Sequence, residues 1–250
     1  MSHRKAEASK RRRHGYFGAT VAATYDAASG DMFEAGVVDP AVDVLAELAG
    51  DGRALEFGIG TGRIALPLAQ RGIEVHGIDL SLAMVDRLRA KPGGSDVGVT
   101  IGDFADTRVP GEFSLTYLVF NTICNLTTQE AQVACFVNAA EHLRPGGHFV
   151  IEVGVPALRL LPPGQRAVPF AVSDGHWAYD LYDCASQAMS SNYVDDHGRR
   201  SIPFRYVWPS ELDLMARIAG MVLADRWEDW DRKPFTHESN RHVTVWRKAN

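Results

Sequence analysis

The residues with the clearest chemical signal stand in a short stretch of closely spaced glycines. Residues 55–65 read LEFGIGTGRIA, with Gly58, Gly60 and Gly62 between an apolar run and a run of helical character. Because glycine has no Cβ atom, a bulky ligand can lie close to the main-chain N–H groups of such a turn. A strand, a glycine turn and a helix in succession are typical of nucleotide-binding α/β proteins. The alternative is that the glycines only form a tight turn.

An acidic residue before the turn distinguishes it from a phosphate-binding turn. A dinucleotide-binding turn has the pattern G-x-G-x-x-G, but the position at the last offset from Gly58 holds Arg63. Glu56 stands at the end of the expected strand, where a carboxylate repels pyrophosphate and attracts an ammonium group. The pattern E-x-G-x-G-x-G therefore favours a ligand with an amino-acid portion.

Two further acids follow the next expected strands, at the edge where open α/β sheets bind ligands. Asp79 can accept hydrogen bonds from ribose hydroxyls. Asp103, in IGDFAD, can accept one from an adenine amino group, and Phe104 offers a backbone N–H to the ring. Other readings stay open, because Asp79 also suits a helix-capping network with Ser81 and Asp103 suits a turn.

The remaining candidates lie towards the centre of the expected crevice. Met84, on the helix after Asp79, suits the cover of an adenine face and equally a core position. The segment FNTICN (120–125) ends the fourth expected strand, which places Phe120, Asn121 and Asn125 at the crevice. Asn121 could equally cap the next segment.

The chain supplies the elements of a parallel sheet in alternation. Helical spacing or capping signals mark residues 37–49, 62–71, 81–90 and 127–143. Apolar or alternating runs mark strands at 53–57, 73–79, 97–101, 113–120 and 148–154. Thr127 and Glu130 form a T-x-x-E capping box, and RPGG (144–147) indicates a turn. This alternation predicts an α/β protein with a doubly wound parallel sheet.

The pattern changes after Pro156, where aromatic residues and strand-like runs such as WAYDLYD predict an antiparallel insertion. A helix at 210–219 and the runs MVLADRWEDW and HVTVWRK then end the chain. We therefore divide the chain into a disordered basic tail (1–14), an N-terminal lid helix with the ligand-binding core (15–155), a substrate-binding insertion (156–208) and a final helix with two strands that complete the core sheet (209–250).

Charge and cysteine content restrict the partners. The chain has 26 Lys and Arg against 31 Asp and Glu, and its first 14 residues are basic, so the rest is more acidic still. An acidic body repels phosphate backbones, which argues against nucleic acid. Three cysteines without a C-x-x-C pair predict a reducing compartment and no metal site. Without an apolar leader or a run of membrane-spanning length, we expect a cytoplasmic protein with no membrane contact.

Together, the motif at 56–62, the acid at Asp79, GDF (102–104) and LRPGG (143–147) resemble class I S-adenosylmethionine-dependent methyltransferases. The resemblance covers about residues 37–155, and the final helix and strands fit the same family. It implies a Rossmann-like seven-stranded sheet, mostly parallel with one antiparallel strand, and S-adenosylmethionine as cofactor, with S-adenosylhomocysteine as product. The cofactor-binding residues that it implies are Tyr25, Glu56, Gly58, Gly60, Gly62, Arg63, Asp79, Leu80, Met84, Asp103, Phe104 and Phe120.

The stretch GYFGATVAATYD (15–26) resembles the N-terminal helix of small-molecule N-methyltransferases, including those that act on amino sugars. In those enzymes aromatic residues of this helix cover cofactor and substrate. They often have a histidine near the end of the fourth-strand segment, where this chain has Asn125. The candidates for a positioning role in catalysis are Asn121, Asn125 and Tyr16, and those for substrate contact are Phe17, Tyr179, Tyr182 and His237.

The expected function is methyl transfer from S-adenosylmethionine to a small molecule, as in specialised metabolism. An amine is favoured over a hydroxyl because a hydroxyl needs a general base, and no His/Asp pair suits that role. The alternatives are a small-molecule O-methyltransferase, an NAD(P)-dependent oxidoreductase and a non-catalytic cofactor-binding protein. A homo-oligomer through the insertion is a further expectation.

Overall fold

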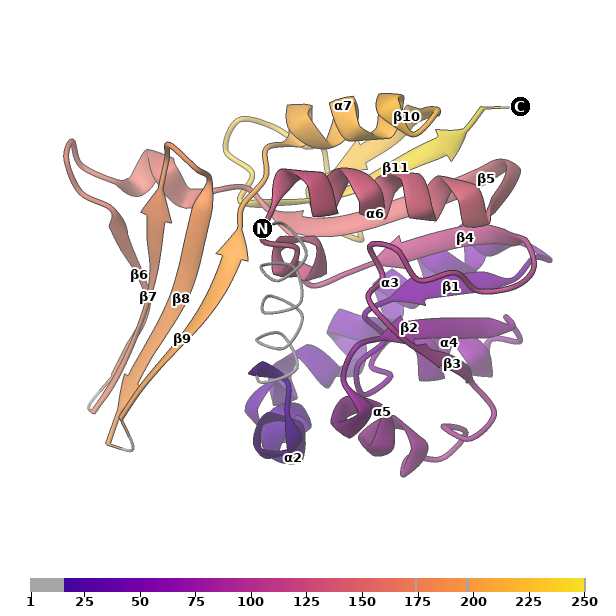
Figure 1. Cartoon of the computed structure of the whole chain (residues 1–250), viewed down its shortest axis with the longest axis horizontal. Coiled ribbons are helices and arrows are strands. Elements are labelled where there is room, and N and C mark those ends of the chain that lie inside the picture. The colour runs from indigo at the N-terminus through magenta and orange to yellow at the C-terminus, as the bar shows by residue number, and fades with distance from the viewer. Residues whose placement is uncertain (1–15, 174, 197, 250) are drawn as a thin grey trace, which may run out of the picture.

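The computed structural model describes residues 16–173, 175–196 and 198–249 (Figure 1). The predicted basic tail, residues 1–14, lies outside the described residues. The described chain forms a central sheet with helices on both faces and a second, separate sheet beside it (Figure 1). The predicted Rossmann-like α/β fold is confirmed.

The central sheet has seven strands in the order β10-β11-β5-β4-β1-β2-β3. Strand β11 runs antiparallel to both β5 and β10, whereas β3, β2, β1, β4 and β5 pair in parallel. The predicted sheet, mostly parallel with one antiparallel strand, is therefore confirmed. Its strands are β1 (Ala54–Phe57), β2 (Val75–Asp79), β3 (Gly98–Ile101), β4 (Phe113–Leu118), β5 (Leu143–Gly154), β10 (Met221–Trp227) and β11 (Arg241–Lys248).

Helices cover both faces because the short parallel strands are apolar on both sides. One buried cluster holds Phe136 and Trp246, whose ring centroids lie 5.3 Å apart, and the other holds Leu45 and Leu68. None of the described helices has the length and apolar character that a membrane span requires. The α-helices are α2 (Ala19–Ala28), α3 (Ala35–Ala49), α4 (Ala65–Gln70), α5 (Leu82–Arg89), α6 (Gln129–His142) and α7 (Pro209–Ile218); the 3-10 helices are η1 (Gly30–Phe33), η2 (Thr122–Asn125) and η3 (Ala157–Leu160).

Two local predictions need correction. The side chain that caps α6 belongs to Thr128, which accepts a hydrogen bond from the Ala131 backbone N–H, so the predicted capping box at Thr127 is wrong. The predicted turn at 144–147 lies inside β5 as an irregularity. There the register moves from Phe113 opposite Leu143 to Leu115 opposite His148, so the extra residues of β5 are accommodated without ending the strand.

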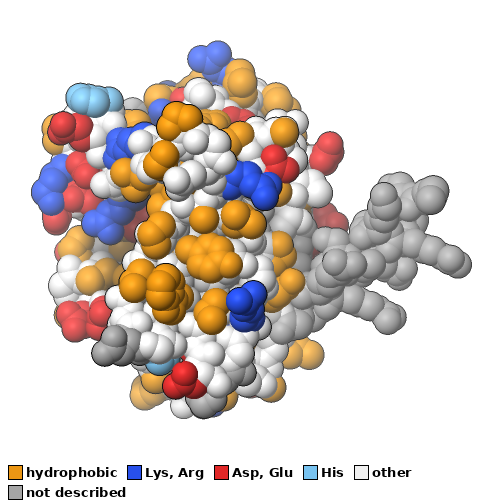
Figure 2. All heavy atoms as spheres, turned by 90° about the vertical axis from the view of Figure 1, so that its left-hand side faces the viewer, with side chains coloured by type: hydrophobic (Ala, Val, Ile, Leu, Met, Phe, Trp, Pro, Cys, Tyr) orange, Lys and Arg blue, Asp and Glu red, His pale blue; other side chains and the backbone are white. Residues whose placement is uncertain are grey.

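The insertion forms the second sheet, which consists of β6 (Ala167–Ser173), β7 (His176–Asp183), β8 (Ala188–Asp195) and β9 (Gly198–Arg205). All neighbouring strands pair antiparallel in sequence order. The second sheet stands at the left of Figure 1, beside α2 and the crevice end of the central sheet. On the side of the molecule that Figure 2 shows, apolar side chains gather; the exposed ones of the second sheet include Phe170, Val172 and Trp177.

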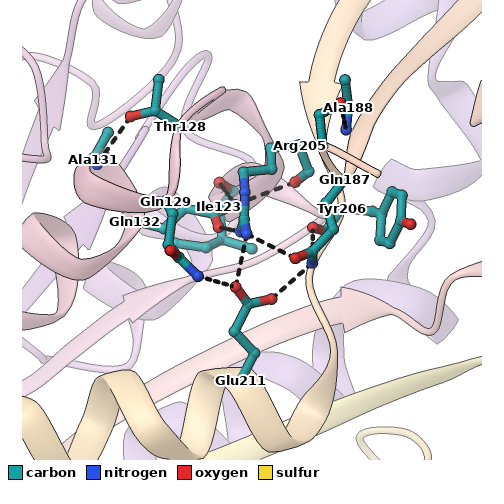
Figure 3. Close-up of polar contacts among 11 residues, drawn as sticks. Ile123, Thr128, Gln129, Ala131, Gln132, Gln187, Ala188, Arg205, Tyr206 and Glu211 are labelled. Carbon is teal, nitrogen blue, oxygen red and sulfur yellow. Dashed lines mark hydrogen bonds and ion pairs between the residues drawn. The ribbon is translucent and has the colours of Figure 1, made fainter. Parts of the chain in front are cut away.

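A polar cluster fixes the second sheet to the core (Figure 3). Arg205, at the end of β9, forms an ion pair of 2.7 Å with Glu211 of α7. The same guanidinium donates to the side-chain oxygens of Gln132, on α6, and Gln187, between β7 and β8. Glu211 also accepts from Gln187 and Gln129, so its carboxylate is satisfied by three side chains. Arg205 is buried, and the cluster therefore sets how the last strand of the second sheet meets the helices.

Candidate active site

A cavity of about 1090 Å³ lies between the carboxyl ends of the central strands, the N-terminal helix and the second sheet. Open α/β sheets bind ligands at this edge. This volume exceeds the range of about 300–1,000 Å³ that is usual for the site of one small ligand, which leaves room for a cofactor-sized and a second molecule. A smaller cavity of about 50 Å³ adjoins it and shares Tyr25, Gly58, Gly60 and Phe120 with it.

The glycine turn gives this cavity its floor. Gly58 and Gly60 line it, with positive φ angles of 72° and 54° that a side chain would strain. A Cβ atom at Gly60 would lie 3.5 Å from the terminal methyl of Met84, which itself lines the cavity. Gly62 differs from the expectation, because it lines neither cavity and a Cβ there would press on Leu88 at 3.0 Å. Its glycine serves the packing of the turn on α5.

Asp79 is fixed by backbone groups on both sides. Its Oδ2 accepts from the Gly60 N–H at 2.7 Å, and its Oδ1 accepts from the Ser81 N–H at 2.7 Å. Ser81 in turn caps α5 by accepting from the Met84 N–H. The capping network and the cavity position of Asp79 therefore exist together. Leu80, Met84 and Asp79 all line the large cavity.

The adenine candidates lie at the end of β3. Asp103 is buried, lines the cavity and accepts from the Ala105 N–H at 3.0 Å. Phe104 lines the same wall, and its ring stacks on that of Phe57 with centroids 5.9 Å apart. Contact with a core ring holds Phe104 in one place, which leaves a defined surface for a flat ligand.

Glu56 and Arg63 line the smaller cavity rather than the large one. Glu56 is buried and accepts a hydrogen bond of 3.0 Å from the Tyr117 hydroxyl. Burial raises the pKa of Glu56 to about 8, although the Tyr117 hydrogen bond and the charge of Arg63 oppose the shift. Arg63 donates to the Met32 carbonyl and lies over the Phe120 ring, 5.1 Å from its centroid. A buried carboxyl of this kind gains a proton unless a cation binds beside it.

The chain leaves β4 through two residues in the left-handed region, Phe120 (φ 58°) and Asn121 (φ 61°). Such conformations are unfavourable for residues with side chains and persist only where other contacts impose them. Here Glu152 accepts from the Phe120 N–H, and the Asn121 side chain accepts from the Gly154 N–H. Phe120, Asn121 and Asn125 all line the cavity.

Helix α2 and the residues before it close one side of the cavity, with Tyr25 on the helix and Tyr16 and Phe17 before it. Asp26 fastens it to the glycine turn, because its carboxylate accepts from the Thr61 hydroxyl at 2.6 Å and pairs with Lys91 at 2.6 Å. The predicted cover over the cavity is therefore held by its own polar contacts.

The second sheet closes the opposite side, with one of its two faces. Tyr182 lines the cavity, as expected, whereas Tyr179 lies on the other face of β7 and does not. His237 is exposed in the loop before β11 and does not line the cavity either. The structure therefore brings Tyr182, but neither Tyr179 nor His237, to the cavity wall. The registers of β7 with β8 and of β8 with β9 place further residues on the same face as Tyr182, which sequence reasoning missed: Asp180, Met189, Ser191, Tyr193, Arg200, Ile202 and Phe204.

The comparisons with known proteins agree with this geometry. Residues 54–147 match the family model of a methyltransferase domain. The cypemycin N-terminal methyltransferase of Streptomyces sp is 29% identical over 203 residues, which cover 78% of this chain and 83% of that protein. The solved CcbJ methyltransferase from Streptomyces caelestis is 36% identical, with a TM-score of 0.74 over 84% of this chain and 89% of that one.

A more distant structure shares the fold with its ligand bound. CalS10 from Micromonospora echinaspora, an amino pentose methyltransferase involved in calicheamicin biosynthesis, was solved with S-adenosylmethionine. It is 20% identical, with a TM-score of 0.60 over 85% of this chain and 90% of that one.

The residues of the cavity fit this cofactor. Gly60 keeps open a space that a side chain would fill, and Asp79, Asp103 and Phe104 all line the cavity. The adjoining Glu56 is a buried acid that a cation would stabilise in its ionised form. With this fit, and with likeness to a methyltransferase at 36% identity over most of both chains, the chain belongs to the class I S-adenosylmethionine-dependent methyltransferases of the small-molecule kind, with S-adenosylmethionine as its cofactor.

Proposed function

We propose that the enzyme methylates an amine nitrogen of its small-molecule acceptor in preference to a hydroxyl. The observation that carries this proposal is the charge of the cavity wall. Its charged residues are three acids, Asp79, Asp103 and Asp180, against the single base Arg200, and no histidine stands among the described residues that line it. An acidic wall favours basic ligands, and a neutral amine attacks without the general base that a hydroxyl needs.

Two of the similar proteins support an amine. The cypemycin enzyme is named for methylation of an N-terminus, and CalS10 for an amino pentose. When bound, S-adenosylmethionine supplies an electrophilic methyl group on a sulfonium. The chain then has to orient the acceptor towards that methyl, because an in-line displacement depends mainly on alignment. We assign this positioning to Tyr16, Asn121 and Asn125, which lie at the centre of the cavity, with Phe17 beside them.

The cofactor contacts are assigned in the same way. Asp79 takes the ribose, Asp103 and Phe104 take the adenine, and Met84 with Leu80 covers the ring. Glu56 takes the ammonium and Arg63 the carboxylate of the methionine portion, with Tyr25 and Phe120 closing this end. All of these residues line one of the two adjoining cavities.

The proposal is tested by product analysis. The protein is incubated with S-adenosylmethionine labelled in its methyl group and with pairs of small molecules that differ only in an amine or a hydroxyl. Mass and fragmentation of the products locate the label. We expect label on nitrogen; label on oxygen alone, from the alcohols, would assign the chain to the small-molecule O-methyltransferases instead.

The setting of the enzyme is part of the proposal. All three cysteines, Cys124, Cys135 and Cys184, are free, which supports a cytoplasmic, reducing compartment. The exposed Val172 and Trp177 support a homo-oligomer through the second sheet, because apolar side chains on a surface favour association. Light scattering of the full chain measures its mass directly.

A further inference from the structure

We infer that Asp180, on the second sheet, binds the protonated amino group of the acceptor and removes its proton. The acceptor is then a basic amine with an apolar body. This inference rests on the proposed function and adds to it the substrate class and the residue that recognises it.

The side chain of Asp180 is held in place at the cavity wall. Asp180 lies on β7 opposite Ser191 of β8, and its Oδ1 accepts a hydrogen bond of 2.6 Å from the Ser191 hydroxyl. Asp180, Ser191 and Tyr182 all line the cavity. Ser191 is buried, and Tyr182 also donates to the carboxylate, so two hydroxyls hold Asp180 in place. A carboxylate can accept more than two hydrogen bonds, so it can still bind a ligand.

The carboxylate has no ion-pair partner in the described part of the chain. The nearby Arg205 is paired with Glu211, and Arg200 lies over the Tyr193 ring, 4.6 Å from its centroid. A partly buried carboxylate without a counter-ion is unfavourable, and a bound ammonium group would supply that counter-ion. A carboxylate that is held in place in this way is suited to bind a cation.

Asp180 also lies within electrostatic reach of η2, the short helix that follows β4. Burial raises the pKa of the Cys124 thiol to about 12, and the charge of Asp180 adds to this shift, so the two side chains lie within electrostatic reach. Cys124 belongs to η2, directly after β4, and lines the cavity with Asn125. An amine held by Asp180 is therefore on the side of the cavity that faces the positioning residues.

The wall around Asp180 describes the rest of the acceptor. Met189 and Phe204 lie opposite each other on β8 and β9, Ile202 lies opposite Ser191, and the buried Tyr206 closes the wall. These side chains suit an apolar or aromatic body. A phosphorylated acceptor would place a further negative charge among three acids, with only Arg200 to offset it.

The proposed proton transfer runs from the acceptor ammonium group to the Asp180 carboxylate. An N–H bond of the acceptor ammonium breaks, its electron pair remains on nitrogen as the lone pair, and an O–H bond forms on Asp180. Burial raises the pKa of Asp180, although hydrogen bonds from Ser191 and Tyr182 oppose the shift. The raised pKa makes the group a better proton acceptor than an exposed carboxylate. The other ionisable groups at this wall are Tyr182 on β7, Tyr193 on β8, Arg200 on β9 and Tyr206, with Cys124 of η2 facing them. The proton leaves Asp180 to water afterwards.

The test uses three probes of one shape, 2-phenylethylamine, 2-phenylethanol and 3-phenylpropanoate. Their binding to the full chain is measured by ligand-observed NMR at neutral pH with saturating S-adenosylhomocysteine, which occupies Asp79 and Asp103. We expect the amine to bind about tenfold or more tightly than the alcohol and the acid, as a charged hydrogen bond implies. Asp180→Asn keeps an acceptor for Ser191 and should remove this preference.

The matched control is Asp183→Asn, which changes a carboxylate of the same strand that binds the β7–β8 turn and does not line the cavity. It should leave the preference intact. Equal binding of amine and alcohol to the unaltered chain overturns the inference, whether or not Asp180→Asn folds. An amine preference that survives in folded Asp180→Asn, checked by circular dichroism, also overturns it.

The labelled-methyl assay separates this inference from the proposed function. Label on oxygen alone, together with a preference for amines that depends on Asp180, defeats the proposed function and leaves the amine site. Label on nitrogen with unchanged kcat/KM in Asp180→Asn defeats the inference and leaves the proposed function.

Discussion

Asp79 and Glu56 are both carboxylates of the cofactor site, but their surroundings give them different tasks. Asp79 has backbone donors on both oxygens, and such donors stabilise the charged form. Glu56 is enclosed and has one hydroxyl donor, so burial raises its pKa to about 8. At neutral pH, Glu56 therefore carries a proton that a cation can displace.

Asp79→Ala should weaken the binding of S-adenosylhomocysteine by about 1.5–3 kcal/mol, the range for hydrogen bonds to a charged group. The measurement is titration calorimetry at fixed pH. Asp86→Ala, an exposed acid on α5, is the control and should bind normally. Equal affinities of the two variants would remove Asp79 from the cofactor site.

Glu56 should release a proton when the cofactor binds. The folded, ligand-free protein keeps this proton below about pH 8, and a neighbouring ammonium favours the ionised form, so binding near pH 7 displaces the proton to solvent. Calorimetry of S-adenosylhomocysteine in buffers of different ionisation enthalpy counts the protons released.

The control for this measurement is Glu56→Gln, which still accepts the Tyr117 hydrogen bond but cannot ionise. It should bind with about one proton fewer released. The same proton count for both proteins would show that Glu56 stays protonated in the complex.

Single residues of the core could be located from the sequence because a strand and a turn fix them. The glycine turn, Asp79 and Asp103 each follow an apolar run, and the ends of parallel strands meet at one edge. The task of Gly62 could not be separated from that of Gly60, since only packing shows that Leu88 fills the space beside it. Asp180 was missed because a carboxylate in an aromatic-rich segment has no neighbour in sequence that reveals its face.

Among the elements, the second sheet shows the effect of strand alternation. Tyr182 lies on the cavity face of β7 with Asp180, and Tyr179 lies on the opposite face. The sequence indicated the strand, but its two tyrosines could be assigned to a face only with the register to β8 in hand.

This difference provides a pair of variants on one strand. Tyr182→Ala should raise the Michaelis constant for the acceptor and leave the affinity for the cofactor unchanged, because Tyr182 belongs to the second sheet and the residues that we assign to the cofactor do not. Tyr179→Ala should leave the kinetics unchanged. Steady-state kinetics with the acceptor found by product analysis tests both, and a larger effect at Tyr179 would contradict the assignment of faces.

At the scale of the whole molecule, the cluster around Arg205 and Glu211 connects the second sheet with α6 and α7 (Figure 3). Burial alone would raise the pKa of Glu211, but hydrogen bonds from Arg205, Gln187 and Gln129 lower it below its ordinary value. A lowered pKa in the folded state means that this stabilisation is present above the unfolded pKa and is lost as the pH falls through the folded pKa.

Glu211→Ala should lower the free energy of unfolding by roughly 3 kcal/mol near neutral pH, because it leaves the buried guanidinium of Arg205 without its counter-ion. Urea unfolding followed by circular dichroism measures this loss. Glu112→Ala, in an exposed loop, should cost little. The double variant Arg205→Met with Glu211→Leu should recover most of the loss. A double variant as unstable as Glu211→Ala would mean that packing, and not charge, stabilises this joint.

The second sheet also has a consequence for how the acceptor specificity of such an enzyme can change in evolution. Its strands pair only with one another, in the order β6-β7-β8-β9, while the seven-stranded sheet keeps its own ladder. One continuous stretch of chain therefore carries the cavity wall that we assign to the acceptor, and a different stretch carries the residues that we assign to the cofactor. Exchange of residues 156–208 for the corresponding segment of a related enzyme, with Arg205 and Gln187 retained, would transfer the choice of acceptor as a unit. New substrates become accessible in this architecture without any change in the glycine turn.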